Sequence, residues 1–381
     1  MTGMTVLPND DAILVGRIFD PATGGPCVVG VHRGRVADLS AHVQTVSQLL
    51  ERQDAAEIVV SACAGSDWDV DLLVRASHSD DREGARLLAP IDLQVIKACG
   101  VTFAGSLVER LIEEQTRGDA ARSDEVREAL LAAIGPDALT VRPGSADAQR
   151  VKSLLVGRGL WSQYLEVGIG PDPEVFTKGP VLSAVGFGQP IGVPRFSDWS
   201  NPEPELVLIV DSSGTPRGAT LGNDVNLRDV EGRSALLLGV AKDNNGSTAI
   251  GPFVRLFEGD FTIDSLREEV IHLAIHGDDG FSLMDTSNMG QISRSFEELV
   301  RAVHGAHHQY PDGFALFTGT LFTPTVDRGR TGEGFTHKLG DLVEISSPHL
   351  GTLSNVVGRS EEIPRWEFGI GALMEHLGSV R

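Results

Sequence analysis

One short segment, Pro202-Glu-Pro-Glu-Leu-Val-Leu-Ile-Val, constrains the fold of this chain more than any other. Its five consecutive apolar residues end at an Asp-Ser-Ser-Gly sequence, the pattern of a buried strand that runs into a turn. Residues two apart on a strand point to the same face, so Glu203 and Glu205 lie side by side where the strand begins. Pro204 cannot donate to a strand ladder, which favours a strand start or an edge. The sequence therefore predicts a buried strand that carries two adjacent carboxylates.

A third carboxylate, Asp224, follows after one turn and one predicted return strand. Adjacent negative charges are costly unless a cation neutralises them. Three carboxylates that leave room for water and substrate oxygens are typical of a site for a hard cation, with Mg²⁺ first and Mn²⁺ or Ca²⁺ as substitutes. Spacing alone leaves a second interpretation open, because paired glutamates at a strand start also occur on solvated edges that discourage aggregation.

Short apolar runs separated by glycine-rich turns indicate a strand-rich chain, and the 44 glycines and 19 prolines supply those turns. Strands are expected within residues 12–40, 206–210, 262–284, 314–317 and 341–346. Helices are expected at residues 46–52, 106–134 (with a candidate break at Gly118) and 295–304. This mixture predicts a β-rich α+β fold with a closed or rolled β-architecture. A small N-terminal α/β domain is expected at residues 1–88 and a larger catalytic domain at residues 89–381.

The net charge of −21, with lysine and arginine scattered singly, argues against a nucleic-acid partner and against an anionic membrane surface. No stretch approaches an uninterrupted apolar membrane span, and the N-terminal residues lack the pattern of a secretory leader. The three cysteines, Cys27, Cys63 and Cys99, are far apart and odd in number, which is typical of a reducing compartment. These features together predict a cytoplasmic protein.

Several motifs occur in an order that resembles the fumarylacetoacetate hydrolase superfamily. Glu203-Pro-Glu205 and the later Asn223-Asp-Val-Asn-Leu-Arg-Asp229 resemble its E-x-E and N-D-x-x-x-R-D pair. The other matches, in chain order, are Phe176-Thr-Lys178-Gly-Pro, Ala241-Lys242 with Ile250-Gly-Pro252, Phe317-Thr-Gly-Thr320, and Leu339-Gly-Asp-Leu-Val-Glu-Ile with Leu350-Gly-Thr-Leu-Ser-Asn. Any one motif is weak, but the ordered set extends over about residues 100–358.

One departure from the family pattern bears on the reaction. Hydrolases of this family carry N-Y-x-x-H-x-x-E, whose histidine and glutamate activate water, and the matching stretch here keeps Glu109 but has Ser106 in place of histidine. Serine is no general base near neutral pH without a partner, so water-activated hydrolysis is disfavoured. A helix N-cap is the structural alternative for Ser106. For Arg110 and Glu113, on the same helical face, a solvated surface is the favoured interpretation.

The missing histidine, the chain length and the segment from Thr331 to Asp341 are similar to the sugar-acid branch of the superfamily. The resemblance implies a mixed β-roll, a homodimer or higher homo-oligomer, and Mg²⁺-dependent dehydration of a 2-keto-3-deoxy-pentonate, as in pentose catabolism. The implied product is 2-oxoglutarate semialdehyde, formed through a metal-stabilised enolate. Glu203, Glu205 and Asp224 are the implied metal ligands.

The other candidate site residues follow from the same resemblance. Lys178 and Glu109 are candidates for the base at C3, and protonated Glu109 is a candidate acid for the departing C4 hydroxyl. Arg228 and Lys242 are candidates for binding the substrate carboxylate or orienting metal ligands, with ion pairs to Asp229 or Glu231 as the structural alternative. The remaining candidates are Ser106 for catalysis, and Thr320 and Ser183 for substrate binding.

Three alternatives to the dehydratase stay open. An acylpyruvate hydrolase and a β-keto acid decarboxylase belong to the same superfamily, and Ser106 argues against the first. A ligand-binding homologue without turnover belongs to a different class of protein. The presence of all three metal-binding carboxylates and Lys178 argues against that last interpretation.

Overall fold

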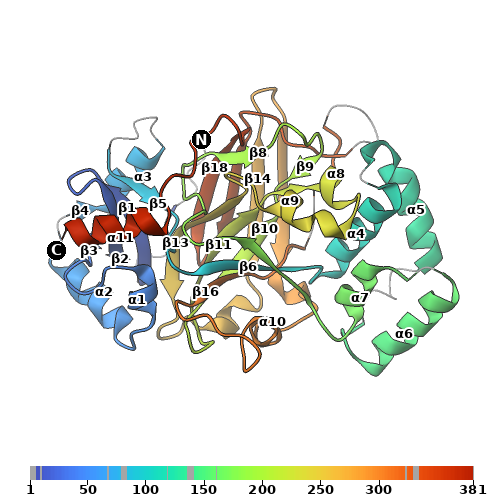
Figure 1. The fold of residues 1–381 in the computed structure, drawn as a ribbon, viewed down its shortest axis with the longest axis horizontal. Coiled ribbons are helices and arrows are strands. Elements are labelled where there is room, and N and C mark those ends of the chain that lie inside the picture. Colours follow the sequence, from blue (N-terminus) through green and yellow to red (C-terminus); the bar gives the residue numbers. More distant parts are fainter. Residues whose placement is uncertain are drawn as a thin grey trace.

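The computed structural model describes residues 6–8, 11–66, 68–78, 84–117, 119–134, 141–159, 161–321, 324–328 and 334–380 (Figure 1). The predicted break at Gly118 and the motif residues Thr331, Gly332 and Glu333 lie outside this part of the chain. Within it, no helix is both long and apolar enough to cross a membrane.

The N-terminal strands form one end of a large mixed sheet. Strands β1 (Leu14–Asp20), β2 (Gly25–His32) and β3 (Arg35–Asp38) pair antiparallel in sequence order. β4 (Trp68–Asp69) pairs with β3, and β5 (Arg86–Leu88) pairs with β1. The helices of this part are α1 (Val46–Leu50), α2 (Ala55–Ala64) and α3 (Val70–Ser77).

The same sheet continues into the rest of the chain, because β1 also pairs with β13 (Thr248–Leu256). Beyond β13 the order is β11 (Pro216–Asp224), β10 (Pro204–Val210), β16 (Phe314–Phe317), β6 (Val95–Gly100) and β7 (Glu174–Gly179). Hydrogen bonds thus join residues on both sides of the expected boundary at residue 88, and the boundary itself stays a prediction.

A second sheet packs on this one through apolar side chains. Its order is β15 (Ser282–Asn288), β14 (Val270–His276), β17 (Leu342–Ser347), β18 (Gly351–Arg359) and β8 (Ile191–Val193). Leu206 and Leu208 of β10 share one buried cluster with Leu273 of β14 and Ile345 of β17. The short strands β9 (Ser200–Asn201) and β12 (Asn226–Leu227) form a separate pair.

Helices gather at the end of the molecule opposite to the N-terminal strands (Figure 1). They are α4 (Ala104–Thr116), α5 (Ser123–Ile134), α6 (Ala146–Gly157) and α7 (Gln163–Ile169). The short helices α8 (Arg228–Glu231) and α9 (Leu238–Lys242) lie between them and the sheet. α10 (Phe296–Val303) begins at Ser295, which forms a capping box with Glu298, and α11 (Ile370–Ser379) packs near β2.

The strand-rich α+β class is confirmed, and both sheets are mixed. The closed variant of the expected architecture is wrong for the described residues, because the large sheet has free ends at β4 and β7. The 106–134 prediction corresponds to two helices, α4 and α5, with a 3₁₀ turn at Ala120–Arg122 between them. The two strands expected in residues 262–284 are β14 and β15, of which β15 continues to Asn288, and a 3₁₀ turn at Ile263–Leu266 precedes them.

Candidate active site

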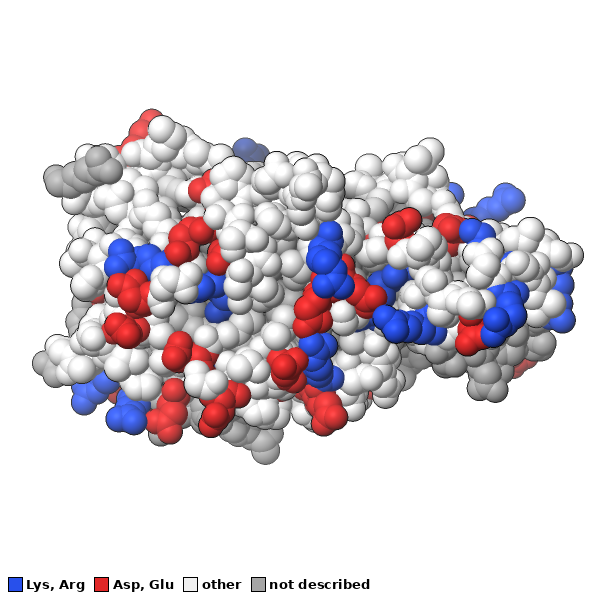
Figure 2. Space-filling model, turned by 90° about the horizontal axis from the view of Figure 1, so that it is seen from below, with Lys and Arg blue, Asp and Glu red and all other residues white. Residues whose placement is uncertain are grey.

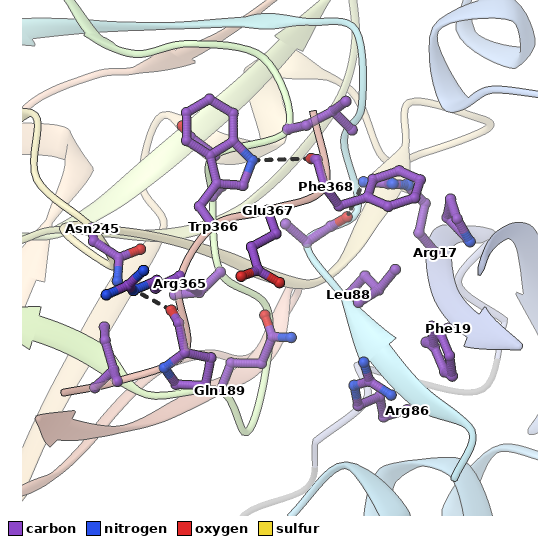
Figure 3. Close-up of a pocket in the computed structure, with 18 of the residues that line it drawn as sticks. Arg17, Phe19, Arg86, Leu88, Gln189, Asn245, Arg365, Trp366, Glu367 and Phe368 are labelled. Carbon is purple, nitrogen blue, oxygen red and sulfur yellow. Dashed lines mark hydrogen bonds between the residues drawn. The ribbon is translucent and has the colours of Figure 1, made fainter. Parts of the chain in front are cut away.

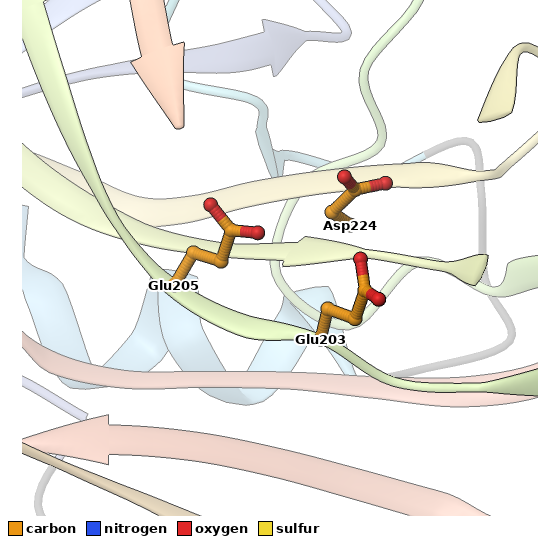
Figure 4. Close-up of side chains that lie close together, drawn as sticks. All are labelled: Glu203, Glu205 and Asp224. Carbon is orange, nitrogen blue, oxygen red and sulfur yellow. The ribbon is translucent and has the colours of Figure 1, made fainter. Parts of the chain in front are cut away.

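The three predicted metal ligands meet at the start of β10 (Figure 4). Each of Glu203, Glu205 and Asp224 offers one carboxylate oxygen, and these oxygens all lie within 4.8 Å of one another. β10 pairs antiparallel with β11, and the Asp224 amide donates to the Glu203 carbonyl at 3.0 Å, so the end of β11 lies beside the start of β10. All three side chains are buried. The solvated-edge alternative is therefore wrong.

Two lysines neutralise part of this charge. Lys242 Nζ lies 2.5 Å from Glu203 Oε2 and 3.1 Å from Asp224 Oδ2, and Lys178 Nζ lies 3.1 Å from Asp224 Oδ1. Although burial lowers the pKa of Lys242, the carboxylates of Asp224 and Glu203 hold it above its ordinary value, so this lysine stays protonated. Burial lowers the pKa of Lys178, and Asp224 offsets part of that effect.

Glu205 differs from its two neighbours because, in the described part of the chain, it forms no ion pair. Its Oε2 accepts a hydrogen bond of 2.6 Å from the Gly319 amide, which a positive φ of 95° at Gly319 turns toward β10. Burial, together with the charges of Asp224 and Glu203, raises the pKa of Glu205 well above its ordinary value. A bound cation would remove the repulsion that raises it.

Arg110 and Glu113 contradict the expected solvated helix face, since both are buried. Arg110 Nη2 donates to Glu203 Oε1 at 2.6 Å, and Arg110 Nη1 donates to Glu113 Oε2 at 2.7 Å. The face of α4 that carries them packs against the acidic cluster rather than against water. The Arg110 guanidinium therefore ties α4 directly to a predicted metal ligand.

Glu109 and Arg228 lie in the same buried network, one step away from the metal ligands. Arg228 donates to Glu113 Oε1 at 2.6 Å and to Glu109 Oε2 at 3.1 Å, and its guanidinium lies 4.2 Å from the centre of the Trp199 ring. Glu109 also pairs with Arg127. Arg228 does not pair with Asp229 or Glu231, the alternative partners that the sequence offered. Glu109 is not among the residues that line the acidic cavity.

The other predicted residues divide between two cavities. Ser106 and Thr320 line the acidic cavity together with Lys242. Ser106 is no N-cap, because the cap of α4 is Phe103, whose carbonyl accepts a hydrogen bond from Ser106 Oγ at 2.9 Å. Ser183 lines a different, larger cavity and donates to the Pro180 carbonyl at 2.7 Å.

Sequence reasoning missed two carboxylates that line the acidic cavity, Glu174 and Glu231. Burial raises the pKa of Glu174, whose side chain has no hydrogen bond or ion pair in the described ranges. Gly100 makes room for it, since a Cβ there would lie 2.1 Å from Glu174 Oε2. Neither glutamate stands in a motif quoted above. Gly100, on strand β6, was the one available signal. It becomes informative only once the pairing of β6 with β7 is known.

Because of Glu231, we expect the free energy of unfolding to depend on pH. Burial raises its pKa from 4.5 to about 7, although Arg110 Nη1 lies 2.7 Å from Glu231 Oε2. A raised carboxyl pKa stabilises the folded state below pH 4.5, and this contribution is lost as the pH rises through about 7. The stability of Glu231→Gln relative to the natural protein should therefore increase from pH 5 to pH 8, by about 3 kcal/mol at most. Chemical unfolding at both pH values measures this difference.

A variant at an exposed glutamate, Glu258→Gln, is the control and should show the same difference from the natural protein at both pH values. If Glu231→Gln also shows no change with pH, Glu231 does not titrate in this range.

Comparison with known protein families identifies the family of this chain. Residues 163–358 match the family model described as the C-terminal domain of fumarylacetoacetate hydrolase. This chain belongs to the fumarylacetoacetate hydrolase family. The matched range contains the three predicted metal ligands, both lysines and Arg228, whereas α4 with Ser106, Glu109 and Arg110 precedes it.

Two curated relatives carry names of sugar-acid dehydratases. The 2-dehydro-3-deoxy-D-arabinonate dehydratase of Saccharolobus solfataricus is 32% identical over 194 residues, 50% of this chain and 60% of that protein. A protein named probable 2-keto-3-deoxyxylonate dehydratase, from Haloferax volcanii, is 34% identical over 194 residues, 51% of this chain and 63% of that protein. The match thus spans about three fifths of each relative's own length.

Solved structures extend the likeness over most of the chain. The apo form of a 2-keto-3-deoxy-D-arabinonate dehydratase aligns with a TM-score of 0.62 and 22% identity, covering 91% of this chain and 99% of that one. A second structure of that enzyme, complexed with magnesium and 2,5-dioxopentanoate, aligns equally well. At this identity the likeness establishes the family fold.

The donor set of the acidic cluster fits a hard divalent cation. All three donors are carboxylate oxygens, which suit Mg²⁺ rather than a metal that prefers nitrogen or sulfur. Glu205 has no cationic partner in the described part of the chain, whereas Lys178 and Lys242 lie beside Asp224 and Glu203. The carboxylate of Glu205, without a positive partner, favours a cation among these oxygens.

Proposed function

We propose that this protein is a Mg²⁺-dependent dehydratase that converts a 2-keto-3-deoxy sugar acid, a 2-keto-3-deoxy-pentonate, into 2-oxoglutarate semialdehyde. The observation that carries the proposal is the buried triad Glu203, Glu205 and Asp224, in which Glu205 lacks a cationic partner within the described residues. The two curated relatives named as dehydratases support the substrate class. So does the related structure with magnesium and 2,5-dioxopentanoate, which is the same compound as the proposed product.

Glu203, Glu205 and Asp224 would hold the cation, and a divalent cation in this position supplies Lewis-acid stabilisation of charge on the keto oxygen. The cavity beside the triad has a volume of about 20 Å³, room for about one water molecule or ion. A five-carbon acid needs more space. We infer that part of this lining moves when substrate binds.

The elimination needs one group that removes the C3 proton and one that protonates the departing C4 hydroxyl. For the base we retain Lys178 from the family resemblance: burial lowers its pKa and its Nζ lies 3.1 Å from Asp224 Oδ1, although Lys178, like Glu109, is not among the residues that line the cavity. For the acid we now favour Glu174 over Glu109. Glu174 lines the cavity, and burial raises its pKa, which favours its protonated form, whereas Glu109 is paired with Arg127 and Arg228. A proton shift from C5 to C3, followed by tautomerisation of the resulting enol, then gives the aldehyde.

Positively charged groups at the cavity would bind the substrate carboxylate. Lys242 is protonated and lines the cavity, and Thr320 lies on its wall. Arg228 contacts Glu109 and Glu113 instead, so we assign it to positioning α4. The homo-oligomeric state and the cytoplasmic location remain predictions.

The test is an assay of the purified protein with each C4 epimer of 2-keto-3-deoxy-pentonate, with Mg²⁺ and then with excess chelator. We expect semialdehyde, detected through a coupled aldehyde dehydrogenase, and its loss with chelator. Glu174→Gln should lower kcat by about 100-fold or more, the scale of a lost general acid, while Mg²⁺ binding stays intact. Glu109→Gln serves as the comparison and should lower kcat less than Glu174→Gln does.

Failure of both epimers would contradict the dehydratase. Release of pyruvate from an acylpyruvate, or of carbon dioxide from a β-keto acid, would favour the two related enzymes instead. Binding of Mg²⁺ without turnover of any keto acid would favour the ligand-binding homologue.

A further inference from the structure

A second cavity lies on the side of the molecule that carries the N-terminal strands (Figure 3). Its volume of about 300 Å³ is at the lower end of the range for small-molecule sites. Strands β1 and β5 form one wall, residues 182–190 form another, and residues 363–368, between β18 and α11, cover it. It shares no lining residue with the acidic cavity. The two cavities are therefore distinct sites.

The covering segment is fixed at several points. Asn245 Nδ2 donates to the carbonyls of Ser360 and Pro364, at 3.0 and 3.1 Å. Within the segment, Trp366 Nε1 donates to the Phe368 carbonyl at 3.0 Å. Beyond it, α11 contacts β2, and His376 Nε2 lies 3.2 Å from the Pro26 carbonyl. The cavity is thus a built part of the fold.

The lining of this cavity is cationic in a chain whose net charge is −21. Three arginines, Arg17, Arg86 and Arg365, line it, and Glu367 is the one acidic residue of the lining that the structure describes. A concave positive lining on an acidic molecule attracts small anions and raises their local concentration.

Arg17 carries most of this argument because its side chain is buried, with 5% of the residue exposed. Its guanidinium donates to the carbonyls of Ile91 and Ala89, at 2.5 and 3.4 Å, and its Nε lies 3.9 Å from Asp92 Oδ2. That carboxylate already accepts backbone hydrogen bonds from Val46 and Ser47. Burial lowers the pKa of Arg17, with Asp92 offsetting only part of the effect. A second anion beside this guanidinium would stabilise its charge.

Aromatic rings form the apolar part of the lining. Phe19 lies on one side, with the Arg86 guanidinium 4.1 Å from its ring centre, and Trp366 and Phe368 lie on the covering segment (Figure 3). Flat rings flanked by guanidinium groups suit a planar apolar body that bears a negative charge. Phosphates and sugars lack such a body.

We propose that this cavity, between β1, β5 and residues 363–368, binds an aromatic carboxylate, with the carboxylate toward the arginines and the ring against Phe19, Trp366 and Phe368. Arginine binds carboxylates through two parallel hydrogen bonds, which fixes the orientation of such a ligand. The site is independent of the acidic cavity and of the reaction there.

The experiment is isothermal titration of the full-length protein with benzoate, and with benzamide as its uncharged analogue. Benzoate should bind at least about tenfold more tightly than benzamide, because a charge-assisted hydrogen bond to arginine is lost with the amide. Arg86→Gln and Arg365→Gln should each weaken benzoate binding by about fivefold or more. Both side chains are at least partly exposed, so these variants should fold, which thermal unfolding checks. Arg33→Gln, an exposed arginine paired with Asp11, is the matched control and should bind benzoate normally.

Two further measurements locate the binding. Benzoate should quench the fluorescence of Trp366, and Trp366→Phe should remove that quenching. Binding should persist in Glu205→Gln, which separates it from any carboxylate binding at the acidic cavity. Equal affinity for benzoate and benzamide, no effect of either arginine variant, loss of binding in Glu205→Gln, or no binding at all would each overturn the proposal.

Discussion

Glu205→Gln is expected to abolish Mg²⁺-dependent turnover and to weaken Mg²⁺ binding by about 100-fold or more, since loss of even an outer partner of a metal ligand costs 10–100-fold. The glutamine keeps the shape of the side chain and its contact with the Gly319 amide, but removes a negative charge from the triad. Calorimetric titration with Mg²⁺ and the semialdehyde assay measure the two effects. Glu258→Gln, at an exposed position, is the control.

The same variant should not unfold the protein. The pKa of Glu205 is raised by burial and by its acidic neighbours, so its ionised form destabilises the metal-free fold at neutral pH. Removing that charge should leave the Tm in excess chelator unchanged or higher. For the natural protein, Mg²⁺ binding should weaken as the pH falls below the raised pKa, because protons compete for this carboxylate. Normal Mg²⁺ affinity and activity in Glu205→Gln would contradict the metal site.

Glu113→Ala is expected to destabilise the fold by about 3–5 kcal/mol, the scale of a broken buried ion pair. Glu113 is fully buried, and its two oxygens receive Arg110 at 2.7 Å and Arg228 at 2.6 Å. Without the glutamate, two buried guanidinium groups lose their shared carboxylate. Urea unfolding with and without the substitution measures the loss.

The neighbouring Glu114 provides the control for that experiment. It lies on the same helix, is partly exposed, and has a long contact of 3.5 Å with Gln163, so Glu114→Gln should change stability by less than about 0.5 kcal/mol. A Glu113→Ala variant as stable as the control would show that the network contributes little. If adding Arg228→Met to Glu113→Ala restores stability, the loss of stability came from the unpaired arginine.

The arrangement of the triad was predictable from the sequence. A strand has a side-chain period of two, so Glu203 and Glu205 had to share a face, and the short connection to the next strand brought Asp224 back beside them. The turn chemistry before residue 216 and the apolar run on β10 specified this hairpin locally. The strand-rich class follows from the same short-range signals.

The charged face of α4 was not predictable. Ser106, Glu109, Arg110 and Glu113 follow one another at helical spacing, and that spacing is identical for a face in water and a face against an ionic cluster. Arg110 contacts Glu203, a predicted metal ligand 93 positions away, and Arg228 contacts Glu113 across 115 positions. Glu174 and Glu231 depend on such distant neighbours too, because their raised pKa values come from burial.

The sequence by itself determined the local geometry and, through the order of its motifs, the family of this protein. Both depend on residues close together in the chain, where strand period and turn residues act directly. Only the tertiary structure decided which charges are buried, which acid lines the cavity, and that Ser183 belongs to a second cavity. These depend on contacts between distant segments, since burial and ion pairing are properties of the packed chain.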